Sequence, residues 1–139
     1  MAPADELWFR VDGEPVPKGR ARARLSTTRT GRPFMHHFTP LETVRYERKV
    51  REVCQLHANV RSWVWTPSDR FEVSVLVFRT HEGRGGDADN YLKTVLDGIN
   101  GVAFRDDRYV RRVETDVYQD ATCPRIEVRV RKVGVGRQR

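Results

Sequence analysis

An apolar strand, a glycine break and an amphipathic helix follow one another between residues 71 and 99, and this order constrains the fold more than any other feature. Residues 71–78 are rich in valine and phenylalanine, which favours a strand. After Gly85-Gly86, apolar residues recur at helical spacing, at Leu92, Val95, Leu96 and Ile99. Residues 110–118 then alternate as a half-buried strand. The order strand, helix, strand predicts a sheet on which this helix packs.

The rest of the chain supplies further strands and a second helix. Short or alternating apolar runs predict strands at residues 7–11, 20–25, 34–38 and 125–132, and the strand at 34–38 is expected to pair with 20–25. A helix is predicted to run to about Ala58, with Thr39 as N-cap, Pro40 at its first position and Glu42 completing a capping box. We therefore predict a single α+β domain, residues 1–139, in which two main helices pack on a mixed sheet. Residues 1–6 and 134–139 are expected to be frayed ends.

Acidic residues gather at one point of this basic chain. Five aspartates fall between residues 87 and 107 of a protein whose formal net charge is +7, namely Asp87, Asp89, Asp97, Asp106 and Asp107. The first two lie where the helix begins, and a side-chain oxygen of either could cap it. The last two follow the helix after a short connection, so that the chain can fold back and bring one of them close to the first two.

This cluster has two interpretations. Mg²⁺ prefers oxygen ligands and usually takes only a few carboxylates, which leaves positions for water and a substrate phosphate. Lys93, one helical turn from Asp89, could then stabilise the charge that develops on the phosphate. Alternatively, the cluster is structural: a helix cap, an i,i+4 row of ion pairs through Asp89, Lys93 and Asp97, and an acidic turn. Spacing alone favours neither interpretation.

The basic residues point to a nucleic acid. The chain has 22 arginines and 4 lysines, and the arginine fork suits bidentate contact with phosphate. In the predicted strand at 20–25, Arg20, Arg22 and Arg24 alternate with small residues, so the three arginines share one face at a spacing of about 6–7 Å. This spacing matches the phosphates along one strand of DNA, although a solvated strand face would have the same pattern.

Other features exclude several classes of protein. No apolar run of transmembrane length, signal peptide or lipid-anchor motif is present, so we expect a cytoplasmic protein without a membrane partner. Cys54 and Cys123 lack the spacing of a zinc site, and Cys54 falls on an apolar helix stripe as a buried structural thiol. His57 and the tryptophans at 63 and 65 are likewise expected in the core or at a subunit interface.

Three parts of the sequence resemble the RusA family of Holliday junction resolvases. The central block has the D-x-D-N-x-x-K pattern at Asp87–Lys93, a following L-D at Leu96-Asp97, and D-D-x-x-V from Asp106 to Val110. The segment Gly13-Glu14-Pro15-Val16-Pro17-Lys18-Gly19-Arg20 is similar to the family's first strand and turn, and Arg20-Ala21-Arg22 continues it. Thr39-Pro40, followed by a helix with Tyr46-Glu47, is a third point of agreement. The resemblance spans about residues 8–132.

This resemblance implies a homodimeric, Mg²⁺-dependent endonuclease that nicks opposed strands of a four-way DNA junction in a bacterial or phage-infected cell. Mn²⁺ would substitute for Mg²⁺, and no small-molecule cofactor is implied. By position, Asp87, Asp89 and one of Asp106 and Asp107 resemble the metal ligands, with Asp107 preferred. Lys93 resembles the catalytic lysine, and Asp97 is expected to have a structural role.

Basic residues near these elements are candidate DNA contacts, namely Lys18, Arg20, Arg22, Arg24, Arg108 and Arg111. Arg108 and Arg111 could instead relieve the repulsion of the acidic pair. Two other functions stay open: a nuclease of the same fold that acts on other branched DNA or RNA, and a DNA-binding module without catalysis. A small-molecule phosphoryl-transfer enzyme would not need so large a basic excess.

Overall fold

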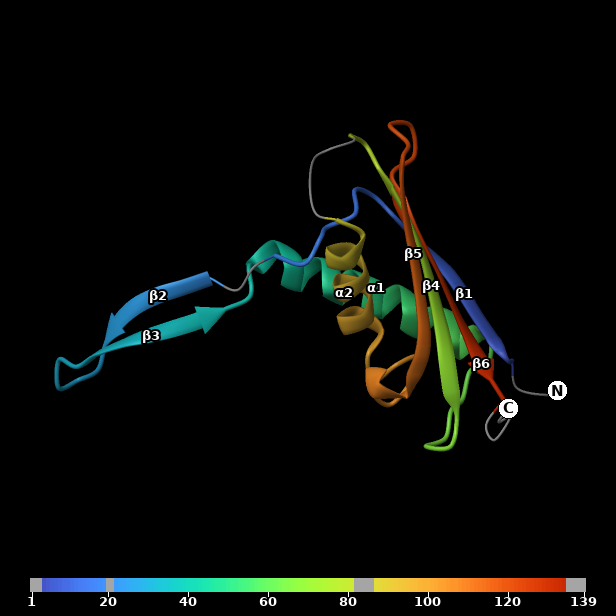
Figure 1. Cartoon of the computed structure of the whole chain (residues 1–139), viewed down its shortest axis with the longest axis horizontal. Coiled ribbons are helices and arrows are strands. Elements are labelled where there is room, and N and C mark those ends of the chain that lie inside the picture. The colour runs from blue at the N-terminus through green and yellow to red at the C-terminus, as the bar shows by residue number, and fades with distance from the viewer. Residues whose placement is uncertain (1–3, 20–21, 82–86, 135–139) are drawn as a thin grey trace.

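The computed structural model describes residues 4–19, 22–81 and 87–134 and consists of one sheet-and-helix body with a projecting hairpin (Figure 1). In chain order, the elements are β1 (Glu6–Asp12), β2 (Arg22–Thr27), β3 (Pro33–Phe38), α1 (Leu41–Val60), β4 (Arg70–Arg79), α2 (Ala88–Ile99), the short 3₁₀ helix η1 (Asp107–Tyr109), β5 (Val110–Gln119) and β6 (Arg125–Val133). The predicted α+β class, with two main helices and a mixed sheet, is confirmed.

The body contains a four-stranded sheet in the order β1-β6-β4-β5. β6 pairs antiparallel with both β1 and β4, whereas β4 and β5 are parallel. A parallel pair needs a crossover connection, and α2 supplies it between β4 and β5. The strand predicted at residues 71–78 is therefore an interior strand.

Both helices cover the same face of this sheet (Figure 1). Alternate residues of β1, β4 and β6 point under them and form a core, including Leu7, Phe9, Val73, Val75, Ile126 and Val128, each at most 1% exposed. α1 adds Tyr46, Val50, Cys54 and Ala58, and α2 adds Leu92, Val95 and Ile99. Neither helix has the length and apolar character needed to cross a membrane.

The hairpin of β2 and β3 forms a separate two-stranded sheet that extends away from the body (Figure 1). The predicted pairing of residues 34–38 with the arginine-rich strand is confirmed, with Arg22 opposite Phe38 and Thr27 opposite Pro33. Hydrogen bonds between Thr28 and Arg32 close the turn. Arg20, one of the predicted DNA contacts, lies outside the described residues.

The start of α1 differs from the prediction. Pro40, not Thr39, occupies the N-cap position, and no side chain caps the helix. Pro40 has the extended angles φ −54° and ψ 141°, and its carbonyl accepts the first helical bond from the Val44 N–H. Because Pro40 lies outside the first turn, the predicted capping box of Thr39 and Glu42 is wrong.

Cys54 and Trp63 lie in the core as expected, whereas His57 and Trp65 are only partly buried. The thiol of Cys54 is buried, which raises its pKa to about 12. His57 packs near Phe9, and its Nδ1 lies 3.0 Å from the Val53 carbonyl oxygen. The Trp63 indole N–H donates to the Ala103 carbonyl at 2.8 Å, and that of Trp65 donates to Val102 at 3.1 Å. Both tryptophans therefore hold the connection after α2 against the body.

Candidate active site

Two predicted metal ligands lie exposed at the N-terminus of α2. Asp87 occupies the N-cap position, but its carboxylate makes no cap hydrogen bond, so the predicted cap is wrong. Its Oδ1 instead accepts from the Asn90 side-chain amide at 3.2 Å. Asp89 lies in the first helical turn. Both carboxylates are exposed and offer oxygen atoms of the kind that a hard cation binds.

Lys93 lies on the exposed side of α2, one turn after Asp89. The structural interpretation of the cluster required an i,i+4 row of ion pairs through Asp89, Lys93 and Asp97. Within the described part of the chain, no ion pair joins Lys93 to either aspartate, because Asp97 pairs with Lys18 at 2.9 Å. The ion-pair row is therefore wrong, and the ammonium of Lys93 is free to face a phosphate.

The acidic turn places two unlike carboxylates side by side. The backbone N–H of Arg108 donates to Asp106 at 3.0 Å, and this bond lowers the pKa of Asp106. Partial burial raises the pKa of Asp107, and hydrogen bonding with Asp106 and the negative charges of Asp106 and Asp97 raise it further. A cation beside Asp107 would therefore relieve an unfavourable charge, whereas Asp106 is already used as the cap of η1. This difference supports the preference for Asp107 as a metal ligand.

The two acidic groups are separated along α2. Asp89 and Asp97 are eight residues apart, a rise of about 12 Å along a helix. In the ranges that the structure describes, no three acidic, histidine or cysteine side chains come close enough together to hold a metal ion. Mg²⁺ does not require such a set, since one or two carboxylates combined with substrate phosphate and water are enough. The ligand set of Asp87, Asp89 and Asp107 stays a prediction.

The predicted DNA contacts fall into three groups. Arg111 is exposed, and Arg108 donates to the Tyr109 hydroxyl at 3.3 Å and lies over its ring. Lys18 is engaged by two carboxylates, Glu47 at 2.7 Å and Asp97 at 2.9 Å. For Arg22 and Arg24 the structure describes the backbone of β2 but not the side chains. All of these DNA contacts stay predictions.

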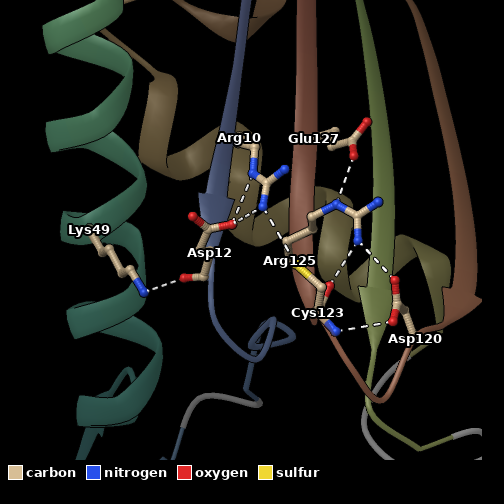
Figure 2. A network of polar contacts seen from close by, with 7 residues as sticks. All are labelled: Arg10, Asp12, Lys49, Asp120, Cys123, Arg125 and Glu127. Atoms are coloured by element: carbon tan, nitrogen blue, oxygen red, sulfur yellow. Dashed lines mark hydrogen bonds and ion pairs between the residues drawn. The ribbon is translucent and has the colours of Figure 1, made fainter.

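The open face of the sheet, which the helices leave uncovered, is neutralised by its own ion pairs. At one end, Arg125 lies over the Phe78 ring. Arg125 also donates to Asp120 and Glu127, as Figure 2 shows. Arg10 bonds Asp12 and the sulfur of Cys123 in the same network (Figure 2). Further pairs on this face join Arg112 to Glu114, Arg129 to Glu6 and Arg131 to Glu72. This face therefore carries little free positive charge for a polyanion.

Unpaired cations lie elsewhere on the molecule. Among the side chains that the structure describes, those without an ion pair include Arg29 and Arg32 in the hairpin turn, Arg45 and Arg48 on α1, Lys93 on α2, and Arg105 and Arg111 around the acidic turn. No sequence signal distinguishes the free arginines of α1 from the paired arginines of β6. Of these side chains, Lys93, Arg105 and Arg111 place free positive charge on the helix of Asp89 or close to the acidic turn in the chain.

Comparison with known protein families agrees with this geometry. The family model for the endodeoxyribonuclease RusA matches residues 12–131, which includes β1 from its last residue, both helices, the acidic turn and nearly all of β6. A search of curated proteins found no match. The matched region contains every candidate metal ligand and the candidate catalytic lysine. The chain belongs to the RusA family of endodeoxyribonucleases, the Holliday junction resolvase family.

Proposed function

We propose that this protein is a Mg²⁺-dependent endodeoxyribonuclease that resolves four-way DNA junctions by paired nicks in the cytoplasm. The observation that carries the proposal is the exposed triplet at the start of α2. Asp87 is the N-cap residue, Asp89 and Lys93 lie on the first two turns, and none of the three forms an ion pair with another described residue. A structural cluster would satisfy these charges internally, whereas a site for a metal and a phosphate needs them free.

The donor set fits a hard divalent cation. Asp87, Asp89 and Asp107 offer carboxylate oxygens, which Mg²⁺ prefers and Mn²⁺ accepts. A cation bound there would neutralise charge on the scissile phosphate and activate the attacking water. Stabilisation of the developing negative charge falls to a side chain of the protein. Lys93 places a positive charge one turn from Asp89, where it stabilises the phosphoryl oxygens as negative charge builds up.

Two copies of the chain are part of the proposal. A four-way junction is resolved only when two opposed strands are cut, so paired incision requires two sites with a fixed separation. A two-fold symmetric dimer provides both sites with one kind of interface. The free arginines near the acidic turn would hold the arms, and each bidentate contact to phosphate would fix the register of the DNA.

The experiment that tests the proposal is the nicking of a synthetic four-way junction in Mg²⁺, beside a linear duplex of the same arm sequence. Wild type is compared with Asp89→Asn and with Asp116→Asn, an aspartate on β5 outside the candidate site. We expect paired cuts in the junction by wild type and Asp116→Asn. Asp89→Asn should bind the junction but cut it at least about a hundredfold more slowly.

Other outcomes would select the alternatives. Cutting of flaps, forks or RNA in preference to the junction would assign the same site to another branched substrate. If all three proteins bind the junction with equal salt dependence and none cuts it, the acidic cluster is structural and the protein is a DNA-binding module. Size measurement by light scattering, with and without junction, tests the dimer separately from catalysis.

A further inference from the structure

Lys18 belongs to the connection between β1 and β2, but its side chain is bound by both helices. Its ammonium lies 2.7 Å from a carboxylate oxygen of Glu47 on α1 and 2.9 Å from one of Asp97 on α2. The side chain is 27% exposed, and that of Glu47 is 21% exposed. Partial burial lowers the pKa of Lys18, but its hydrogen bonds to both carboxylates outweigh this effect and raise it. The ammonium is therefore a fixed positive charge between the two helices.

The helix packing creates the need for this charge. Gly98 lets α1 and α2 approach so closely that an added Cβ would lie 3.1 Å from the Glu47 carbonyl oxygen. This approach brings the carboxylates of Glu47 and Asp97 within 3 Å of a single ammonium. Without Lys18, two negative charges would face each other in a partly buried site, where repulsion is stronger than at the surface.

The backbone around Lys18 is held as well. The Lys18 N–H donates to the Asn90 carbonyl in the first turn of α2 at 2.9 Å. The next N–H, that of Gly19, donates to the buried hydroxyl of Thr43 on α1 at 3.2 Å. Lys18 thus contacts α2 near Asp89 through its backbone and near the other end of the helix through its ammonium.

Asp97 connects this ion pair to the acidic turn. The charge of Asp97 acts on Asp107, the preferred metal ligand. Arg51 of α1 donates to the backbone carbonyls of Asp97 and Asn100, at 3.2 and 2.9 Å, and so fixes the end of the same helix. Because α2 ends two residues after Asp97 and the chain then leads to Asp107, a shift of this helix end would also move the connection to the acidic turn.

We propose that Lys18 is a positioning residue, which acts through Asp97 to hold α2 and the acidic turn in the arrangement needed for strand cutting. The role deepens the proposed nuclease function and rests on it. It differs from the phosphate contact predicted from the sequence, because the ammonium is already shared by two carboxylates. Lys18 should therefore determine the rate of cutting and leave the affinity for DNA unchanged.

The test separates cutting from binding in four proteins: wild type, Lys18→Met, Lys18→Arg and Lys49→Met. Lys49 is the matched control, since its substitution also removes one lysine, but the Lys49 ammonium bonds the Asp12 carbonyl oxygen and pairs with no carboxylate of the described residues. Single-turnover nicking of a saturating four-way junction in Mg²⁺ gives the rate. Junction affinity in Ca²⁺ over a series of salt concentrations gives the binding and its salt dependence.

We expect Lys18→Met to cut about tenfold more slowly or worse, since small displacements of catalytic groups have effects of this size. Its affinity and salt slope should match wild type. Lys18→Arg, which keeps the charge, should recover most of the rate, and Lys49→Met should cut like wild type. If Lys18→Met instead binds more weakly and its salt slope falls by about 0.9, Lys18 is a phosphate contact and the proposal is wrong.

A second readout does not depend on activity. Hydrogen exchange of the metal-free proteins should show faster deuterium uptake across residues 95–107 in Lys18→Met than in Lys18→Arg or Lys49→Met. If wild type cuts no DNA, the proposed function fails and this comparison alone decides the positioning role. Equal uptake in all four proteins would overturn it.

Discussion

Gly98 of α2 lies against Val50 of α1 so closely that a Cβ added to the glycine would be 2.9 Å from Val50 Cγ1. Real Cβ atoms do not approach side-chain carbons to this distance, and Val50 is fully buried with no room to move away. The contact lies one residue from Asp97. The packing of the two helices and the geometry of the candidate site therefore both depend on the lack of a side chain at position 98.

Gly98→Ala should therefore destabilise the fold, although alanine is the better helix former. Overpacking of this kind costs about 1–3 kcal/mol in the free energy of unfolding. Urea denaturation measures it, with Lys93→Ala, an exposed site on the same helix, expected to change stability by less than about 0.5 kcal/mol. Equal stability of Gly98→Ala and wild type would contradict this prediction, because it would mean that the helices can move apart without a loss in the free energy of unfolding.

Trp63→Phe should destabilise the fold by removing one buried hydrogen bond. The indole N–H donates to the carbonyl of Ala103, a residue with no exposed surface, and phenylalanine would leave that carbonyl unsatisfied. The expected loss is about 1–3 kcal/mol by chemical denaturation. Trp8→Phe is the control, because Trp8 is 41% exposed on the open sheet face and should change stability by less than about 0.5 kcal/mol. A similar effect of both substitutions would contradict the role of the indole N–H.

The acidic pair should give opposite stability effects in the metal-free protein. The pKa of Asp107 is raised in the fold, so its charged form weakens the folded state, and stability is regained as the pH falls through that pKa. The pKa of Asp106 is lowered, so its contribution is present above the ordinary aspartate pKa of about 3.9 and is lost as the pH falls through the lowered value.

Asp107→Asn should therefore raise the Tm at pH 7, and this gain should shrink as the pH falls toward 4 and Asp107 of the wild type becomes protonated. Asp106→Asn should lower the Tm at pH 7. Thermal unfolding monitored by circular dichroism at several pH values measures both. A lower Tm for Asp107→Asn at pH 7 would contradict this prediction, because it would show that another group stabilises the charge of Asp107 in the wild type.

The unpaired arginines of α1 should contribute to DNA binding, and those of the open sheet face should not. Replacing Arg45 and Arg48 with glutamine should weaken junction binding. Each phosphate contact removed should reduce the slope of log K against log salt by about 0.9. Arg129→Gln, which removes the partner of Glu6, should leave the slope unchanged. The reverse pattern would place the DNA on the open face.

The sequence predicted the elements well and their contacts less well. Strands at residues 7–11, 71–78 and 125–132 were found because one face of each is buried, which produces a visible alternation. The helix starts were less accurate: Pro40 lies outside α1, and Asp87 does not cap α2. Capping depends on the local orientation of one side chain, which residue type does not determine.

Contacts between residues that are distant in the chain could not be predicted from the sequence. Nothing in the residues around Lys18 indicates that Glu47 and Asp97 would be its neighbours, since this contact arises from the close approach of two helices. The same holds for Arg129 and Arg131 of β6, which look like free cations in the sequence and meet Glu6 of β1 and Glu72 of β4 only because these strands lie beside β6. Charge composition thus predicted a polyanion partner but not the face that binds it.

The position of β6 also has a consequence for synthesis of the protein. This last strand lies between β1 and β4, so Leu7 at one end of the chain is paired with Val130 near the other. While the ribosome is still adding residues 125–133, β1 and β4 have no strand between them, and the sheet is incomplete. A chain that loses β6 to premature termination therefore lacks an interior strand, and the remaining strands have apolar edges that invite aggregation.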